Sequence, residues 1–102
     1  MKQMQMMAQV KKMQAEMLKA QEELAATVVT GSAAGGSVTV EMTCDNRIKS
    51  VKIAPEAIDP QDAETLEDLI VVAVNDALQR TAQESQKRMG AVTGGIRIPG
   101  LT

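Results

Sequence analysis

The chain has no Phe, Tyr or Trp among its 102 residues. Its core must therefore consist of Leu, Ile, Val, Met and Ala, which gain less per side chain on burial than aromatic residues do. A chain of this length allows one domain with one modest core, and the lack of aromatic residues makes burial against a second chain more likely. Base stacking is also unavailable, which argues against single-strand nucleic-acid binding of the OB or RRM type.

Catalytic side chains are scarce. The sequence has no His, so the usual general base at neutral pH is missing, and Cys44 has no His to activate it. We interpret Cys44 as an inert core thiol because it lies on the apolar side of a predicted strand. Glu64, Glu67 and Asp68 could hold Mg²⁺ or Ca²⁺ loosely, but complementing a helix dipole explains them more simply. We therefore predict a non-enzyme with no catalytic residues, no metal site and no cofactor.

Long apolar runs are also absent. No stretch approaches the 18 residues that a membrane span requires, and the N-terminus lacks the apolar block of a signal peptide. A single Cys allows no internal disulfide, which is consistent with a reducing compartment. We expect a cytoplasmic protein without a membrane partner. The net charge of −2 gives no overall signal for nucleic acid, so the distribution of charge matters more.

The rest of the chain is organised around a long helix predicted over residues 59–89. Asp59 suits the N-cap, and Pro60 suits the first helical position, where no backbone donor is needed. Asp62 can point back at the free N–H groups of the first turn. Gly90 suits the left-handed position just after the helix.

The two halves of this helix differ. The first half carries apolar residues over an arc of roughly 200°, wider than the ~100° stripe that one core requires. The half from Gln79 to Arg88 has only Ala82 to bury, so we expect it to project into solvent. We predict that the wide arc serves both the monomer core and a dimer interface. The predicted interface residues are Leu66, Leu69, Ile70, Val71, Val74 and Leu78.

Residues 1–24 predict a second helix. Apolar residues follow each other at steps of four and three, which is the heptad spacing of a helix that packs on another helix. This seam consists of Met6, Val10, Met13, Met17, Ala20 and Leu24. The Met residues fill the seam or, alternatively, form an adaptable docking surface, since Met repacks easily.

Residues 25–58 predict three strands. The first is placed at 25–30, followed by a flexible glycine-rich turn at 31–36 that lacks the features of a phosphate-binding loop. Residues 37–44 alternate cleanly, with Val38, Val40, Met42 and Cys44 on the apolar face. A tight turn at 45–47 leads into a strand at 48–53, with Val51 and Ile53 inward. We predict an α+β fold of order α-β-β-β-α with an antiparallel sheet and a mobile tail at 90–102.

Both chain ends are mildly basic, whereas residues 59–76 carry six anions and no cation. Lys and Arg can bind the phosphates of duplex DNA without reading its bases. Each is individually more typical of a solvated surface, and dimerisation would double every patch. The candidate DNA-binding residues are Lys2, Lys11, Lys12, Lys19, Arg80, Lys87 and Arg88.

A family resemblance joins these features. After the Met-rich helix come Val28-Val29-Thr30-Gly31 and Gly35-Gly36-Ser37-Val38-Thr39-Val40, then Val51-Lys52-Ile53-Ala54-Pro55. Leu66-Glu67-Asp68-Leu69 and Asn75-Asp76-Ala77 follow, and Pro99-Gly100 lies near the end. In this order and spacing the chain resembles the YbaB/EbfC family of bacterial nucleoid-associated proteins. It departs from the pattern near Val74, where an aromatic residue would be expected.

The resemblance implies an intertwined, tweezer-like homodimer with protruding helices. It also implies binding of duplex DNA, with roles in nucleoid organisation and gene expression. Two alternatives come from other functional classes. The first is a protein-interaction module that grips a replication or repair partner without touching DNA. The second is a carboxylate-metal enzyme, which the missing acid–base residues disfavour.

Overall fold

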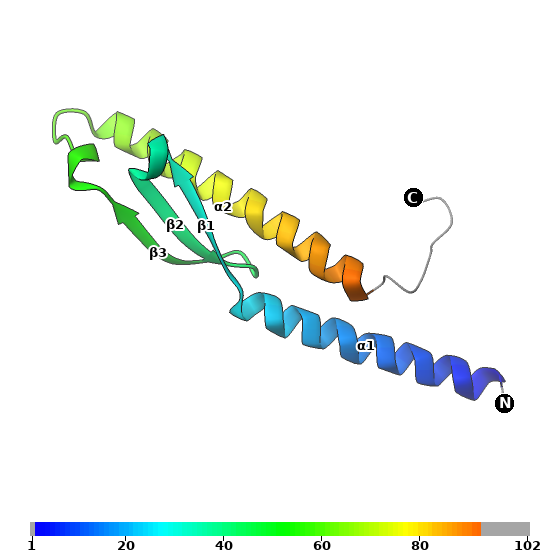
Figure 1. Ribbon diagram of the computed structural model, residues 1–102. Helices are drawn as coiled ribbons and strands as arrows, with labels where there is room; N and C mark the ends of the chain where they lie inside the picture. The colour runs from blue at the N-terminus through cyan, green and yellow to red at the C-terminus, as the bar shows by residue number, and fades with distance from the viewer. Residues whose placement is uncertain (1, 93–102) are drawn as a thin grey trace, which may run out of the picture.

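The computed structural model of the chain describes residues 2–92 and confirms an α+β fold of order α-β-β-β-α (Figure 1). The helices are α1 (Lys2–Ala26) and α2 (Ala63–Val92). The strands are β1 (Val28–Ala33), β2 (Val38–Thr43) and β3 (Arg47–Ile53). They form one antiparallel sheet in the order β1-β2-β3. Residue 1 and residues 93–102 lie outside the described part, and with them most of the tail predicted at 90–102.

The helix α1 extends two residues further than predicted, because Ala25 and Ala26 are strong helix formers that prolong it. Thr27 ends it: its hydroxyl donates a hydrogen bond to the carbonyl of Glu23 at 2.7 Å, and its backbone N–H donates to the carbonyl of Leu24 at 3.1 Å. Only the C-terminal end of the heptad seam is buried, at Ala20 and Leu24.

The first strand was predicted wrongly at 25–30, and Gly31 was wrongly placed in a turn. The strand β1 spans Val28–Ala33, and Gly31 pairs with Val40 inside the sheet. The turn follows as the short 3₁₀ helix η1 (Ala34–Gly36), in which Ala34, Gly35 and Gly36 have φ of 51°, 67° and 98°. The glycines at 31–36 therefore have two different roles: Gly35 and Gly36 form the turn, whereas Gly31, inside the sheet, allows close packing.

The hairpin of β2 and β3 follows the prediction closely. Val38, Val40, Met42 and Cys44 are all buried, as the alternation indicated. Asn46 takes the left-handed conformation in the tight turn, with φ of 65°. A register shift lies opposite Glu41 and Met42, so that Met42 pairs with Ile48 while Val40 pairs with Val51.

The start of α2 differs from the prediction. The helix begins at Ala63, after the 3₁₀ helix η2 (Pro55–Ala57) and a short loop. Asp62 makes the capping contacts, since its carboxylate accepts hydrogen bonds from the backbone N–H of Thr65 at 3.3 Å and from its hydroxyl at 2.6 Å. Asp59 instead closes the preceding turn by accepting a hydrogen bond from the N–H of Gln61 at 3.0 Å.

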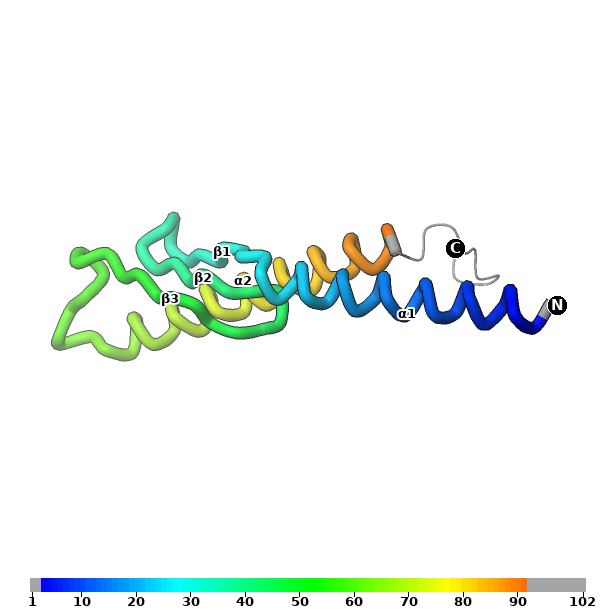
Figure 2. The backbone as a smooth tube through the Cα atoms, turned by 90° about the horizontal axis from the view of Figure 1, so that it is seen from below, coloured from blue at the N-terminus to red at the C-terminus, as the bar shows by residue number. Residues whose placement is uncertain are grey.

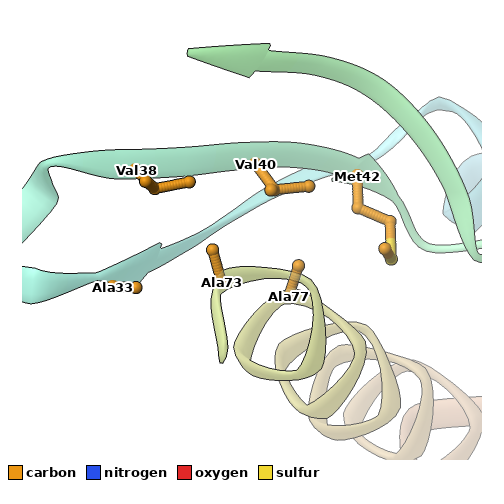
Figure 3. Packing of buried hydrophobic residues seen from close by; sticks show 6 residues of the cluster. All are labelled: Ala33, Val38, Val40, Met42, Ala73 and Ala77. Atoms are coloured by element: carbon orange, nitrogen blue, oxygen red, sulfur yellow. The ribbon is translucent and has the colours of Figure 1, made fainter. Parts of the chain in front are cut away.

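The core lies between the sheet and the first half of α2. Figure 3 shows Val38, Val40 and Met42 of β2 pointing toward Ala73 and Ala77 of α2. Beside them Gly31 contacts the helix backbone. A Cβ at Gly31 would lie 2.4 Å from the carbonyl oxygen of Ala73 and 2.4 Å from the backbone nitrogen of Ala77. Small residues on both elements therefore set how closely helix and sheet approach.

The second half of α2 does not project into solvent, which corrects the prediction. It runs alongside the C-terminal half of α1 in both views (Figures 1 and 2). Thr81 is 1% exposed, and its hydroxyl donates to the side-chain oxygen of Asn46 at 2.9 Å or to the carbonyl of Leu78 at 2.7 Å. The helix also continues through Gly90 to Val92, and the exposed Ala91 lines a shallow pocket together with residues of α1.

The projecting element is the N-terminal half of α1. It extends past the end of α2, which gives the molecule principal extents of 72 × 27 × 16 Å (Figure 2). We call residues 3–17 of α1 the arm. No helix within the described residues is long and apolar enough to cross a membrane.

Candidate nucleic-acid interface

Three of the predicted DNA-binding lysines stand on the arm and just behind it. Lys11, Lys12 and Lys19 are exposed, and none of them forms an ion pair with another described residue. At 100° per residue, Lys12 and Lys19 lie about 20° apart around the helix, with Lys11 about 80° to 100° away. The α1 lysines therefore share one side of the helix. The side chain of Lys2, the remaining candidate on α1, lies outside the described part.

The cations of α2 are placed differently. Arg80 pairs with Asp76 one turn earlier, at 3.2 Å. Arg88 pairs with Glu23 of α1 and so ties the second half of α2 to α1. Lys87 is exposed and has no ion pair among the described residues. The two arginines therefore already have carboxylate partners, whereas Lys87 resembles the lysines of α1.

Two further exposed lysines lie on β3 and were not among the predicted residues. Lys52 pairs with Thr39 on the sheet face that points away from α2, and Lys49 lies at the register shift. The alternation of the strand, with Val51 and Ile53 inward, was a signal that could have drawn attention to Lys52. Arg47 begins the same strand and pairs with Asp45 at 3.6 Å.

Asp76 connects helix and sheet at the outer edge of β1. Its carboxylate accepts a hydrogen bond from the backbone N–H of Ser32 at 2.9 Å and another from Arg80. The Ser32 hydrogen bond, followed by the Arg80 interaction, lowers the pKa of the Asp76 carboxyl from its ordinary value of 3.8. This bond also fixes the orientation of α2, with the Asp76 side of the helix facing the β1 edge.

An exposed apolar surface lies on the opposite side of α2. The helix packs under β1 and β2, so the side of β3 that faces the helix layer remains uncovered. Ile48 and Val51 share that sheet face with Met42 and Val40 but are 53% and 44% exposed. Val71 and Leu78 of α2, which are 57% and 39% exposed, lie on the helix side away from Asp76. We call Ile48, Val51, Val71 and Leu78 the β3–α2 groove.

The predicted interface residues divide between this groove and the core. Leu66, Leu69, Ile70 and Val74 are partly buried against the core of the same chain. Of the predicted interface residues, only Val71 and Leu78 are exposed. The side chain of Val51 lies on the predicted face of the sheet, but α2 does not cover it. The sheet therefore exposes an apolar strand that sequence reasoning assigned to the monomer core.

The described residues offer little for catalysis. Cys44 is buried, and desolvation raises the pKa of its thiol. The nearby Glu84 carboxylate adds to this shift, so the thiol stays protonated and unreactive. Glu64, Glu67 and Asp68 are all exposed, and no group of three potential metal ligands occurs within residues 2–92.

Comparison with known sequences identifies the family. The pattern of the YbaB/EbfC DNA-binding family matches residues 1–96. The chain belongs to this family. A nucleoid-associated protein of Chloroflexus aurantiacus is 46% identical over 97 residues, which cover 95% of this chain and 97% of the relative. Another relative, a nucleoid-associated protein of Pelotomaculum thermopropionicum, is 48% identical over 96 residues, which cover 94% of this chain and 91% of the relative.

A solved structure supports the fold of this YbaB/EbfC chain. The uncharacterized protein HP0035 from Helicobacter pylori superposes with a TM-score of 0.70 at 21% sequence identity. The match covers 85% of this chain and 90% of the other. At that level of identity the likeness concerns the fold alone. The solved structure supports the order of helices and strands, and the sequence comparisons confirm the resemblance to the family.

Proposed function

We propose that this YbaB/EbfC protein is a homodimer that binds duplex DNA through phosphate contacts. It alters the conformation of the DNA and serves nucleoid organisation and gene expression, in the nucleoid of the bacterial cytoplasm. The observation that carries the proposal is the unpaired lysines on one side of a helix whose N-terminal half projects from the molecule. The relatives named nucleoid-associated proteins support the same role.

The lysines of α1 are suited to phosphates and not to base reading. Lys12 and Lys19 are seven residues apart on the helix, about 10 Å along its axis. That distance is about three base steps of a DNA strand at ~3.4 Å each. Flexible ammonium groups at this spacing can each bind a phosphate without fixing a sequence. Lys11 and Lys87 supply further unpaired charge.

Arg80 and Arg88 have smaller parts in this proposal. A phosphate would have to compete with Asp76 for Arg80 and with Glu23 for Arg88. Arg88 also holds α2 against α1, so its contribution to binding is to position the helix. The acidic start of α2, from Asp62 to Asp68, repels DNA from the opposite end of the molecule.

The β3–α2 groove is the proposed dimer interface. Its residues are apolar on both walls, and a second copy related by a two-fold axis would place the same residues opposite one another. Exposed apolar surface of this kind is covered most economically by an identical copy, since both grooves are then buried together. A dimer formed here carries two α1 arms, as a tweezer-like shape requires.

A salt-titrated duplex-binding assay tests the DNA proposal. The logarithm of the binding constant should fall linearly with the logarithm of the salt concentration, with a slope of about −0.9 for each neutralised phosphate. Changing Lys12 and Lys19 together to Gln should weaken binding and make the slope shallower by about 0.9 for each phosphate that is no longer neutralised. Absence of binding at low salt, or binding that is insensitive to salt, would contradict the proposal.

The matched control changes Lys49 and Lys52 of β3 to Gln, which removes the same charge at exposed positions away from α1. Light scattering on both variants checks that dimers persist. We expect the control to keep most of its affinity and nearly its full salt slope. An equal loss of affinity in both variants would show that net charge, and not the α1 lysines, governs binding.

A protein-interaction module is the second candidate, because the arm exposes methionines. Met4, Met6 and Met7 are 77%, 65% and 62% exposed, and Met side chains adapt to varied partners. Such a module would grip a replication or repair partner without direct DNA contact. A pull-down with the tagged protein from nuclease-treated lysate distinguishes the two candidates. A partner protein that is recovered, together with no duplex binding at low salt, would favour the interaction module.

A further inference from the structure

The seam on α1 is covered at one end and uncovered at the other. Ala20 and Leu24 are 3% and 5% exposed where α1 meets the body of the molecule. Further along the same seam, Met17, Val10 and Met6 are 39%, 54% and 65% exposed, and Met13 is half-buried. The heptad spacing therefore continues for several turns beyond the point where its partner stops.

The cause is the length of α2. The two helices run in opposite directions, and α2 ends beside the middle of α1 (Figures 1 and 2). Ala91 lines a shallow pocket with Glu16, Lys19 and Ala20 of α1, so the described end of α2 lies next to the start of the uncovered seam. A chain that continued in the direction of α2 would follow the arm toward its N-terminus.

The uncovered seam has a shape that an apolar segment can enter. Met6, Met7 and Val10, with the stems of Lys11 and Gln14, line a pocket of about 320 Å³ on the arm. Its walls are mainly apolar. Met7 and Leu18 widen the apolar stripe on one flank, where they are 62% and 59% exposed.

We propose that the chain's own residues 93–102 bind along this uncovered seam. This segment follows directly from the end of α2 and contains Ile96, Ile98 and Leu101. Ten residues can reach about 33 Å, whereas the seam from Met17 to Met6 is about 17 Å long. Ile96 and Ile98 are two residues apart, the spacing that puts both side chains on one side of an extended chain.

The proposal goes beyond DNA binding and is independent of it. The stripe formed by Met6, Val10 and Met17 lies roughly 150° around the helix from Lys12 and Lys19. A segment that covers this stripe leaves Lys12 and Lys19 open, whereas Lys11 lines the pocket on the arm. The covered seam also removes apolar surface that would otherwise attract unrelated proteins.

The test measures methyl proximity in the full-length chain by NMR. With Met and Ile methyl groups labelled, we expect nuclear Overhauser effects between the methyl groups of Met6 or Met7 and those of Ile96 or Ile98. A sample that mixes labelled and unlabelled chains separates effects within one chain from effects between chains. Absence of these effects, or their presence only between different chains, would overturn the proposal.

Peroxide oxidation provides a second measurement. Changing Ile96 and Ile98 together to Asp should speed sulfoxide formation at Met6 and Met7 at least twofold, because their cover is removed. The matched control changes Thr93 and Thr102 to Asp, which adds the same charge outside the apolar pair. Equal oxidation rates in the two variants would contradict the proposal. Duplex affinity should be the same in both, so failure here leaves the DNA proposal untouched.

Discussion

Single small residues decide how α2 sits on the sheet. At Gly31 the strand approaches the backbone of α2 closely, and only the small side chains of Ala73 and Ala77 lie on the helix there. Sequence reasoning noticed Gly31 but placed it in a turn, because a glycine near Gly35 and Gly36 is typical of a loop. Nothing in the local sequence shows that a helix more than 40 residues later lies against it.

Changing Gly31 to Ala should destabilise the protein by about 1–3 kcal/mol, the usual cost of overpacking a tight contact. The added Cβ would lie 2.4 Å from two backbone atoms of α2, and backbone cannot move away as a flexible side chain can. Urea unfolding followed by circular dichroism measures the change. Ser32→Ala at the exposed neighbouring position is the control and should stay within about 0.5 kcal/mol. Equal stability of both variants would disprove the tight contact.

Asp76 gives stability a pH dependence. Its pKa is lowered in the folded protein, so the unfolded chain binds a proton first as pH falls. The stabilising contribution is therefore complete above the ordinary value of 3.8 and is lost as pH falls through the lower folded value. Asp76→Asn should be less stable than the parent at pH 7, and the gap should narrow by pH 3. Urea midpoints at the two pH values measure this, and a constant gap would contradict it.

At the scale of elements, sequence patterns located both helices and all three strands but not every boundary. The alternation in β2 and the tight turn at Asn46 were visible because they depend on local spacing and local chemistry. The start of α2 was misplaced because Asp59-Pro60 and Asp62 both have cap chemistry. Only the hydrogen bonds of Asp62 with Thr65 in the structure decide between them.

The prediction of which element projects into solvent was wrong for a different reason. The polar composition of residues 79–88 predicted a solvated arm, yet Thr81 is buried in contact with Asn46 of the β2–β3 turn, and Arg88 pairs with Glu23 of α1. A buried threonine satisfied by Asn46 looks polar in sequence and acts as a core residue in the fold. The candidate lysines of α1 could be chosen from sequence, whereas the engagement of Arg80 and Arg88 required tertiary structure.

A substitution at Gly90 tests where α2 ends, because its effect on stability has opposite signs inside the helix and at a left-handed cap. The structure places it inside the helix, with nothing within 4 Å of an added Cβ. Gly90→Ala should therefore stabilise the last turn, by up to about 1 kcal/mol, because alanine is the better helix former. Amide exchange of residues 86–91 should slow. Faster exchange would indicate the left-handed capping conformation that the sequence suggested, in which a Cβ is unfavourable.

At the scale of the whole molecule, the uncovered strand β3 predicts the oligomeric state. Val51 lies in the β3–α2 groove, 44% exposed in a single chain although its partner Val40 is fully buried. If a second copy covers the groove, Val51→Lys would bury an ammonium group against apolar walls, which costs several kcal/mol without a partner charge. We therefore expect this variant to dissociate into monomers at micromolar concentration, while the parent remains a dimer by light scattering.

The control for this prediction is Val72→Lys. Val72 is 53% exposed on α2, but it lies about 100° or more around the helix from Val71 and Leu78. The substitution adds the same charge to a similarly exposed valine, so a general effect of net charge would dissociate both variants. Dissociation of the Val51 variant alone places the interface in the groove.

Because paired arms increase the effective concentration of their phosphate contacts, the Val51→Lys variant should also bind duplex DNA more weakly, although all its α1 lysines are intact. A dimer that survives Val51→Lys would show that β3 faces solvent and that the two arms are joined elsewhere.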